Sequence, residues 1–137
     1  MDTSAQYIKM CEEAVEIQTV WEPSEGDFVA EIESKHLTHI LKESARGGLI
    51  IEVGWDGDHY DFMREDSVWL PRQDQLQEMV GVHLPKLVDN FWQWLYDKTG
   101  YETVLMDTFT SFEQLWLAFV MHEKYGKRWD GNEWVLQ

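Results

Sequence analysis

The sequence is short of basic residues, and this shortage excludes two classes of partner. Lysine and arginine together number 11 against 26 acidic residues, so the formal net charge is −15. A chain with this balance lacks the basic face that binding to nucleic acid or to anionic lipid requires. We therefore expect no direct nucleic-acid binding and no membrane association.

Cysteine and long apolar runs are also scarce. Cys11 is the single cysteine, so the chain cannot form an internal disulfide and needs no oxidising compartment. No apolar run approaches the ~18 residues of a membrane-spanning helix, and no basic-then-apolar leader opens the sequence. These features predict a cytoplasmic protein.

What the chain does contain is apolar and aromatic side chains. Apolar residues make up 44% of 137 residues and include eight tryptophans, which excludes a disordered or low-complexity chain. The length is that of one ordinary domain, large enough for its own core. We predict a single domain spanning 1–137.

Helical and strand patterns alternate along the sequence. Apolar residues recur at helical spacing in five segments, which are 5–19, 35–46, 72–80, 85–98 and 111–125. Ser34 is the expected N-cap of the second, Thr110 and Glu113 have capping-box spacing, and Gly100 is the expected end of the fourth. Strands are predicted at 27–33, 49–55 and 58–63, with a terminal hairpin at 128–135 and a loop through 68–70. The fold class is therefore α+β with a small antiparallel sheet.

The segment 111–125 is apolar on nearly all sides. Leu117 and Met121 lie almost opposite the main apolar face of this predicted helix. Such a helix is either enclosed within its own domain or meets a partner on one side. Leu117 and Met121 are therefore candidates for contact with a protein partner or a second copy of the chain.

The eight tryptophans each bring a large apolar ring and an N–H donor. Most should lie in the core, but one or two could line a groove for a peptide or a ring-shaped ligand. Trp129 and Trp134, on the short terminal hairpin, are the best candidates for this role.

Acidic residues cluster between 56 and 66. Asp56, Asp58 and Asp61 could supply oxygen ligands to a divalent cation, as in a metal-dependent hydrolase or nuclease. However, Asp56 and Gly57 also have the sequence of a tight hairpin turn, for which a solvated acidic loop suffices. Both interpretations remain open.

No recognised catalytic motif is present. The sequence lacks a nucleophile elbow, a phosphate-binding glycine loop, a dinucleotide-binding fingerprint and a zinc-ligand spacing. We therefore expect no cofactor and assign no catalytic residue.

Charge is distributed unevenly along the chain. Residues 1–33 hold nine acids and one base, and residues 52–66 hold six acids and one base. If these carboxylates share one face, they could imitate a DNA backbone and occupy the groove of a DNA-binding protein. An acidic DNA mimic is therefore an alternative function.

Three segments carry a resemblance to known proteins. They run Trp-Glu-Pro-Ser-Glu-Gly-Asp-Phe-Val (21–29), WLPRQDQLQEMVG (69–81) and SFEQLWLAFVMHEKYGKRW with DGNEW after it (111–134). The chain resembles small uncharacterised proteins encoded by phages and prophages of Gram-positive bacteria, over somewhat under half of its length. The resemblance implies a bacterial cytoplasm and a phage-derived gene, and no activity or site residue. The leading hypothesis is a phage or prophage accessory protein that acts through protein–protein contact.

Overall fold

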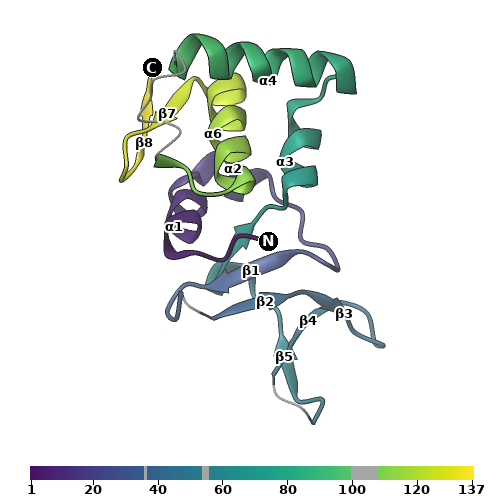
Figure 1. The fold of residues 1–137 in the computed structure, drawn as a ribbon. Coiled ribbons are helices and arrows are strands. Elements are labelled where there is room, and N and C mark those ends of the chain that lie inside the picture. The colour runs from purple at the N-terminus through teal and green to yellow at the C-terminus, as the bar shows by residue number, and fades with distance from the viewer. Residues whose placement is uncertain (36, 54–55, 100–107) are drawn as a thin grey trace. The chain divides into compact units, whose positions relative to one another are not determined.

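The computed structural model describes residues 1–137 except 36, 54–55 and 100–107 (Figure 1). Within these ranges the chain is α+β, with five α-helices and small antiparallel sheets of short strands, which confirms the predicted fold class. It falls into two compact units, the N-terminal unit Thr3–Pro71 and the C-terminal unit, Arg72–Gln137 with Met1–Asp2. That 1–137 is one domain stays a prediction.

The N-terminal unit begins with two helices where one was predicted. The pattern over 5–19 is divided into α1 (Ala5–Glu13) and α2 (Val15–Val20). Ala14 separates them with φ −83° and ψ 68°, outside the helical region. Ser4 caps α1, because its side chain accepts a hydrogen bond from the Tyr7 N–H. The helical spacing of 5–19 continues through Ala14, so the break could not be seen in the sequence pattern.

Two antiparallel sheets form the rest of the N-terminal unit. The first has the order β2-β1-β6 and the second β3-β4-β5, with a short 3-10 turn (η1, Arg64–Asp66) before β6. Their bounds are β1 Phe28–Glu31, β2 Thr38–Ile40, β3 Lys42–Glu43, β4 Leu49–Glu52, β5 His59–Asp61 and β6 Ser67–Leu70. The last two residues of the strand predicted at 49–55 lie outside the described residues.

The helix predicted at 35–46 is wrong, because this segment forms β2 and β3. Its first part turns back tightly, with the Leu37 N–H donating to the Ser34 carbonyl at 2.7 Å. The edge of β1 then supplies the backbone partners of β2, with Val29 opposite His39. The loop predicted through 68–70 is also wrong, since it forms β6 on the other edge of β1. Pairing with β1 therefore outweighs the local pattern on both sides.

Side chains from α1 and α2 secure β6. The Tyr7 hydroxyl donates to the Pro71 carbonyl at 2.6 Å. The Gln18 amide donates to the Trp69 carbonyl and accepts from the Trp69 N–H, both at 2.9 Å, so it satisfies the edge of β6 as another strand would. The Trp21 and Trp69 rings stack 5.6 Å apart, and the Trp21 indole donates to the buried Asp27. This cluster is the polar and aromatic centre of the unit.

The C-terminal unit is built from three helices and a hairpin. Figure 1 shows α4 lying across the ends of α3 and α6, and the hairpin lies beside α6. The bounds are α3 Gln73–Val80, α4 Leu84–Thr99, α6 Phe112–Tyr125, β7 Lys127–Trp129 and β8 Trp134–Leu136. Each helix agrees with its predicted segment to within two residues, although Gly100, the predicted end of α4, lies outside the described residues.

The ends of α6 are fixed by side chains and by one glycine. The Ser111 hydroxyl, and not Thr110, caps the helix by accepting from the Gln114 N–H at 3.1 Å, which corrects the predicted capping box. Thr110 instead bonds Gln114 through its hydroxyl and its N–H. Gly126 ends the helix at φ 63°, in the left-handed region that favours glycine.

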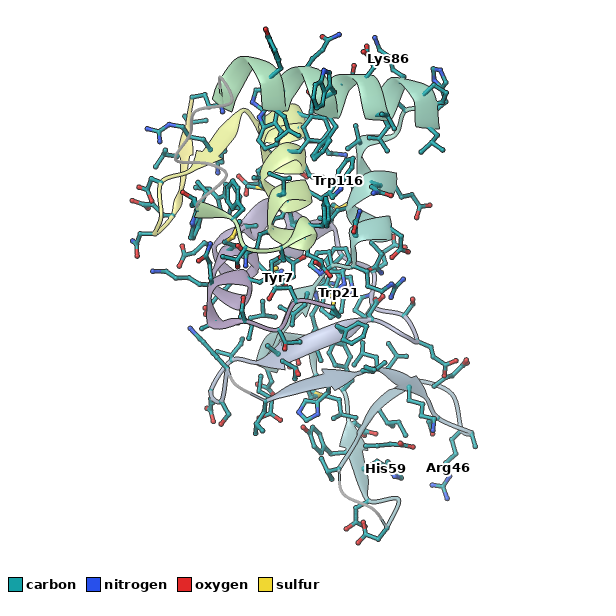
Figure 2. The ribbon with its side chains drawn as sticks, in the orientation of Figure 1. Tyr7, Trp21, Arg46, His59, Lys86 and Trp116 are labelled. Carbon is teal, nitrogen blue, oxygen red and sulfur yellow. The ribbon has the colours of Figure 1, made fainter. Side chains whose placement is uncertain are left out.

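Aromatic rings join α4 to α6 (Figure 2, where Trp116 is labelled). Phe91 of α4 stacks on Trp116 of α6 with ring centroids 4.0 Å apart. Phe119 packs edge-on against Phe91 and lies 5.4 Å from Trp94. These contacts involve the side of α4 that carries Phe91 and Trp94.

Candidate functional site

The predicted contact residues on α6 are not on the surface. Leu117 and Met121 are both 0% exposed, as are Phe119 and Val120. The first of the two interpretations of this helix therefore holds, because α6 is enclosed on nearly all sides. Leu117 and Met121 are core residues, and their assignment to a partner surface is corrected.

An exposed apolar surface lies on α4 instead. Leu84, Val88, Trp92 and Tyr96 are between 53% and 67% exposed. They are spaced four residues apart, so they form one continuous stripe along the helix, which we name the α4 face. Isolated apolar residues on a surface are ordinary, but a stripe of four that includes two large rings is not.

The helical geometry explains why this face exists. At 100° per residue, the α4 face covers an arc of about 120°. It adjoins the arc of Leu87, Phe91 and Trp94, which packs against the rest of the unit, so α4 is apolar over about 200°. A helix that packs on one side needs a stripe of roughly 100°. The polar residues Lys86, Asp89 and Gln93 occupy the remaining arc.

The hairpin tryptophans are buried but border a cavity. Trp129 and Trp134 are each 7% exposed and lie against one another with centroids 5.0 Å apart. Beside Trp129 is a cavity of about 370 Å³, which we name the aromatic pocket. Its lining includes Trp94, Phe109, Ala118, His122, Lys127, Arg128, Trp129 and Gln137. Of the two predicted groove residues, Trp129 therefore lines a cavity. Trp134 does not line it but packs against the Trp129 ring.

The aspartates proposed as metal ligands do not form a metal site in the described ranges. Asp56 and Asp58 are exposed and flank Gly57 in the turn, where an Asp56 oxygen accepts from the Asp58 N–H at 3.3 Å. In the part of the chain that the structure describes, no three His, Cys, Asp or Glu side chains converge as metal ligands. Asp56 and Asp58 shape a hairpin turn, and the metal hypothesis receives no support from these residues.

Asp61 belongs to a different feature, a cleft of about 660 Å³ in the N-terminal unit. Its acidic lining residues are Glu31, Glu33, Asp61, Glu65 and Asp66, and its apolar ones include Ile32, Ile51, Tyr60 and Met63. None of the described lining residues is basic. This acidic cleft brings together carboxylates from both acidic segments, 1–33 and 52–66.

One carboxylate of the acidic cleft is held by hydrogen bonds. The Glu31 Oε1 atom accepts from the Tyr60 hydroxyl at 2.7 Å and lies 2.9 Å from the His39 Nε2 atom. Burial, the hydrogen bond to Glu31 and its negative charge raise the pKa of Tyr60 to about 12. Tyr60 therefore stays a neutral donor throughout the physiological range, and Glu31 is already engaged.

No helix within the described ranges is long and apolar enough to cross a membrane. In the comparisons with known proteins, no protein-family profile, curated protein or solved structure matches this chain. Inference about function therefore rests on the three surfaces just described.

Proposed function

We propose that this chain is a phage or prophage accessory protein that acts in a bacterial cytoplasm by binding another protein through the α4 face. The setting is supported by the resemblance of three segments to phage and prophage proteins. The contact is supported by the exposure of four apolar side chains in one stripe on a 16-residue helix. A partner that covers them removes apolar area from water.

The expected gain is large enough to matter for binding. Fully burying a large apolar side chain is worth about 1.5–3 kcal/mol, and each member of the α4 face is already partly covered. A partner would therefore gain about 1 kcal/mol from each, centred on Trp92. Aromatic anchors of this kind contribute most of the affinity in known interfaces. The polar arc of α4 supplies the edge of such an interface.

Acidic substitutions on the two sides of α4 test this proposal. Trp92→Glu places a charge in the middle of the α4 face, while Lys86→Glu makes an acidic change on the polar arc of the same helix. Tagged wild-type and variant chains are used to capture partners from the cell that encodes them, and light scattering measures self-association. Far-UV circular dichroism checks that each variant is folded.

The expected result is a partner, or a second copy, retained by the wild type and by Lys86→Glu and lost from Trp92→Glu. A partner retained equally by Trp92→Glu would place the contact elsewhere. A wild type that is monomeric and retains nothing specific would contradict the proposal.

The acidic cleft supports a second candidate function, an acidic mimic of DNA. Five carboxylates from two distant segments line one cleft that also has apolar walls. This arrangement suits a partner that offers lysine or arginine side chains together with apolar contacts, such as the DNA-binding surface of another protein. It is separate from the α4 face and can be tested separately.

Titration with an octalysine peptide at low and moderate salt tests the cleft. The double variant Glu33→Gln with Glu65→Gln should weaken binding about tenfold at low salt, because two unscreened charges are lost. The matched control is Glu78→Gln with Glu123→Gln, which removes the same charge from the C-terminal unit. Equal weakening in both variants would mean that the peptide responds only to net charge.

A further inference from the structure

We propose that the aromatic pocket of the C-terminal unit is a binding site for a small organic anion that carries an aromatic ring, such as an aromatic carboxylate. The pocket lies wholly within this unit, between α4, α6, the segment before α6 and the terminal hairpin. Its volume of about 370 Å³ falls in the range of small-molecule sites. The proposal is independent of the α4 face and of the acidic cleft.

The walls of the pocket suit a flat ring. Trp94, Phe109 and Trp129 each contribute an aromatic side chain, and each is less than a tenth exposed. The side chain of Ala118 on α6 is a single methyl group, whereas its sequence neighbours Leu117 and Phe119 are large. A small residue at this buried position leaves space that a leucine would fill. Aromatic walls around such a space favour a ring by stacked or edge-on contacts.

The charges beside the pocket favour an anion. Lys127 and Arg128 line it, and Asp130 is the acidic side chain among the described lining residues. The Asp130 carboxylate is engaged by the hairpin turn, because one oxygen accepts from the Asn132 and Glu133 N–H groups at 2.7 and 2.8 Å. Side chains alternate along a strand, so Lys127 shares the Trp129 side of β7 and Arg128 lies on the other side. Lys127 therefore places a cation on the pocket side of the hairpin in a chain whose net charge is −15.

A histidine in the lining is already oriented. The His122 Nδ1 atom lies 2.7 Å from the Gln137 side-chain oxygen. Because that oxygen can only accept, Nδ1 carries the proton and Nε2 is the remaining polar atom of the ring. The His122 ring also lies 6.1 Å from the Trp94 ring. A ring fixed in this way provides a directional polar contact beside the aromatic walls of the pocket.

Three probes with the same ring and different charge test the proposal. Indole-3-acetate is anionic, 3-methylindole is neutral and tryptamine is cationic. Each is titrated into the full ¹⁵N-labelled chain while the backbone and indole N–H resonances are followed. We expect saturable shifts at Trp94, Trp129 and His122 with indole-3-acetate, and binding of tryptamine at least about fivefold weaker. Absence of saturable shifts, or equal affinity for the anion and the cation, would overturn the proposal.

Two kinds of variant separate the shape of the pocket from its charge. Ala118→Leu should remove the binding of indole-3-acetate by filling the cavity. The double variant Lys127→Gln with Arg128→Gln should weaken indole-3-acetate by up to about fivefold for each charge and leave 3-methylindole unchanged. If Ala118→Leu does not fold, the charge variant still decides. Undiminished affinity for indole-3-acetate in the charge variant would overturn the assignment.

Discussion

The helices α4 and α6 relate sequence to burial in opposite ways. α6 has apolar residues on nearly all sides and is buried on nearly all sides, including Leu117 and Met121. In α4 the apolar residues fit a single broad face, and yet part of that face is exposed. The candidate contact residues of α6 are buried, and the exposed apolar stripe lies on α4, whose sequence looked ordinary.

The difference shows what an apolar pattern does and does not measure. The pattern gives the width of the apolar arc, which is a property of one helix. Burial depends on how many neighbours surround that helix, which is a property of the fold. α6 contacts α3, β7 and the Phe91 and Trp94 rings of α4. In α4, by contrast, Val88 and Trp92 are more than half exposed. The exposed part of the α4 apolar arc is therefore the part that neighbouring elements do not cover, and we expect a partner to bind there.

Truncation of a ring in each helix should give the largest contrast. Phe119→Ala in α6 should lower the free energy of unfolding by about 3–5 kcal/mol, because it leaves a cavity in a closely packed aromatic cluster. Trp92→Ala in α4 removes a larger ring but should cost less than about 1 kcal/mol, since the ring is half exposed. Urea denaturation followed by circular dichroism measures both, and similar losses would remove the contrast.

The two helices should also differ in their glutamines. Gln114 of α6 is fully buried, donates to Asp2 at 2.8 Å and accepts from the Thr110 N–H at 3.0 Å. Gln114→Leu leaves these groups without their partner and should cost about 1–3 kcal/mol. Gln93→Leu on exposed α4 should stay within about 0.5 kcal/mol. Comparable denaturation midpoints for the two variants would show that the Gln114 bonds contribute little.

The C-terminal end of α6 gives a smaller effect. Gly126 has φ 63°, and open space surrounds the position of its missing Cβ. Gly126→Ala should therefore cost about 1 kcal/mol through backbone strain alone. Gly126→Asn should cost less, since asparagine tolerates this conformation better. A neutral Gly126→Ala in thermal denaturation would mean that the helix end adjusts.

The same valine-to-alanine substitution should change the free energy of unfolding in opposite directions in the two helices. Val120→Ala in buried α6 should lower the free energy of unfolding by about 2 kcal/mol. Val88→Ala in exposed α4 should raise it by about 0.5 kcal/mol, because alanine is the better helix former and little burial is lost. Paired urea titrations measure this difference. A loss at Val88 close to the loss at Val120 would mean that α4 is covered in solution.

Local signals predicted the C-terminal unit better than the N-terminal one. Proline, glycine and helical periodicity fixed α3, α4 and α6 to within two residues. The errors at 35–46 and 68–70 both involve strands on the two edges of β1. The strands β2, β3 and β6 are each too short to carry much pattern of their own. In addition, β6 pairs with β1, which is far away in sequence.

The candidate sites also differ in how far they could be predicted from the sequence. Trp129 was recognisable from an unusual tryptophan-rich hairpin, and it does line a cavity. Of the α4 face, Val88 and Trp92 follow the helical spacing of the segment predicted at 85–98, whereas Leu84 lies outside that segment. Nothing local marked which apolar residues would stay exposed. The acidic cleft requires β1 and the segment after β5 to meet, and only the fold can supply that.

Site-specific photo-crosslinking along α4 tests whether a partner binds at the α4 face. A photoreactive amino acid is placed singly at each position from 84 to 96, and the adducts formed in the cell that encodes the protein are quantified. If a partner binds the α4 face, we expect one adduct whose yield peaks at 84, 88, 92 and 96 and falls at 86, 89 and 93. A yield that is uniform along the helix, or that peaks on the polar arc, would contradict it.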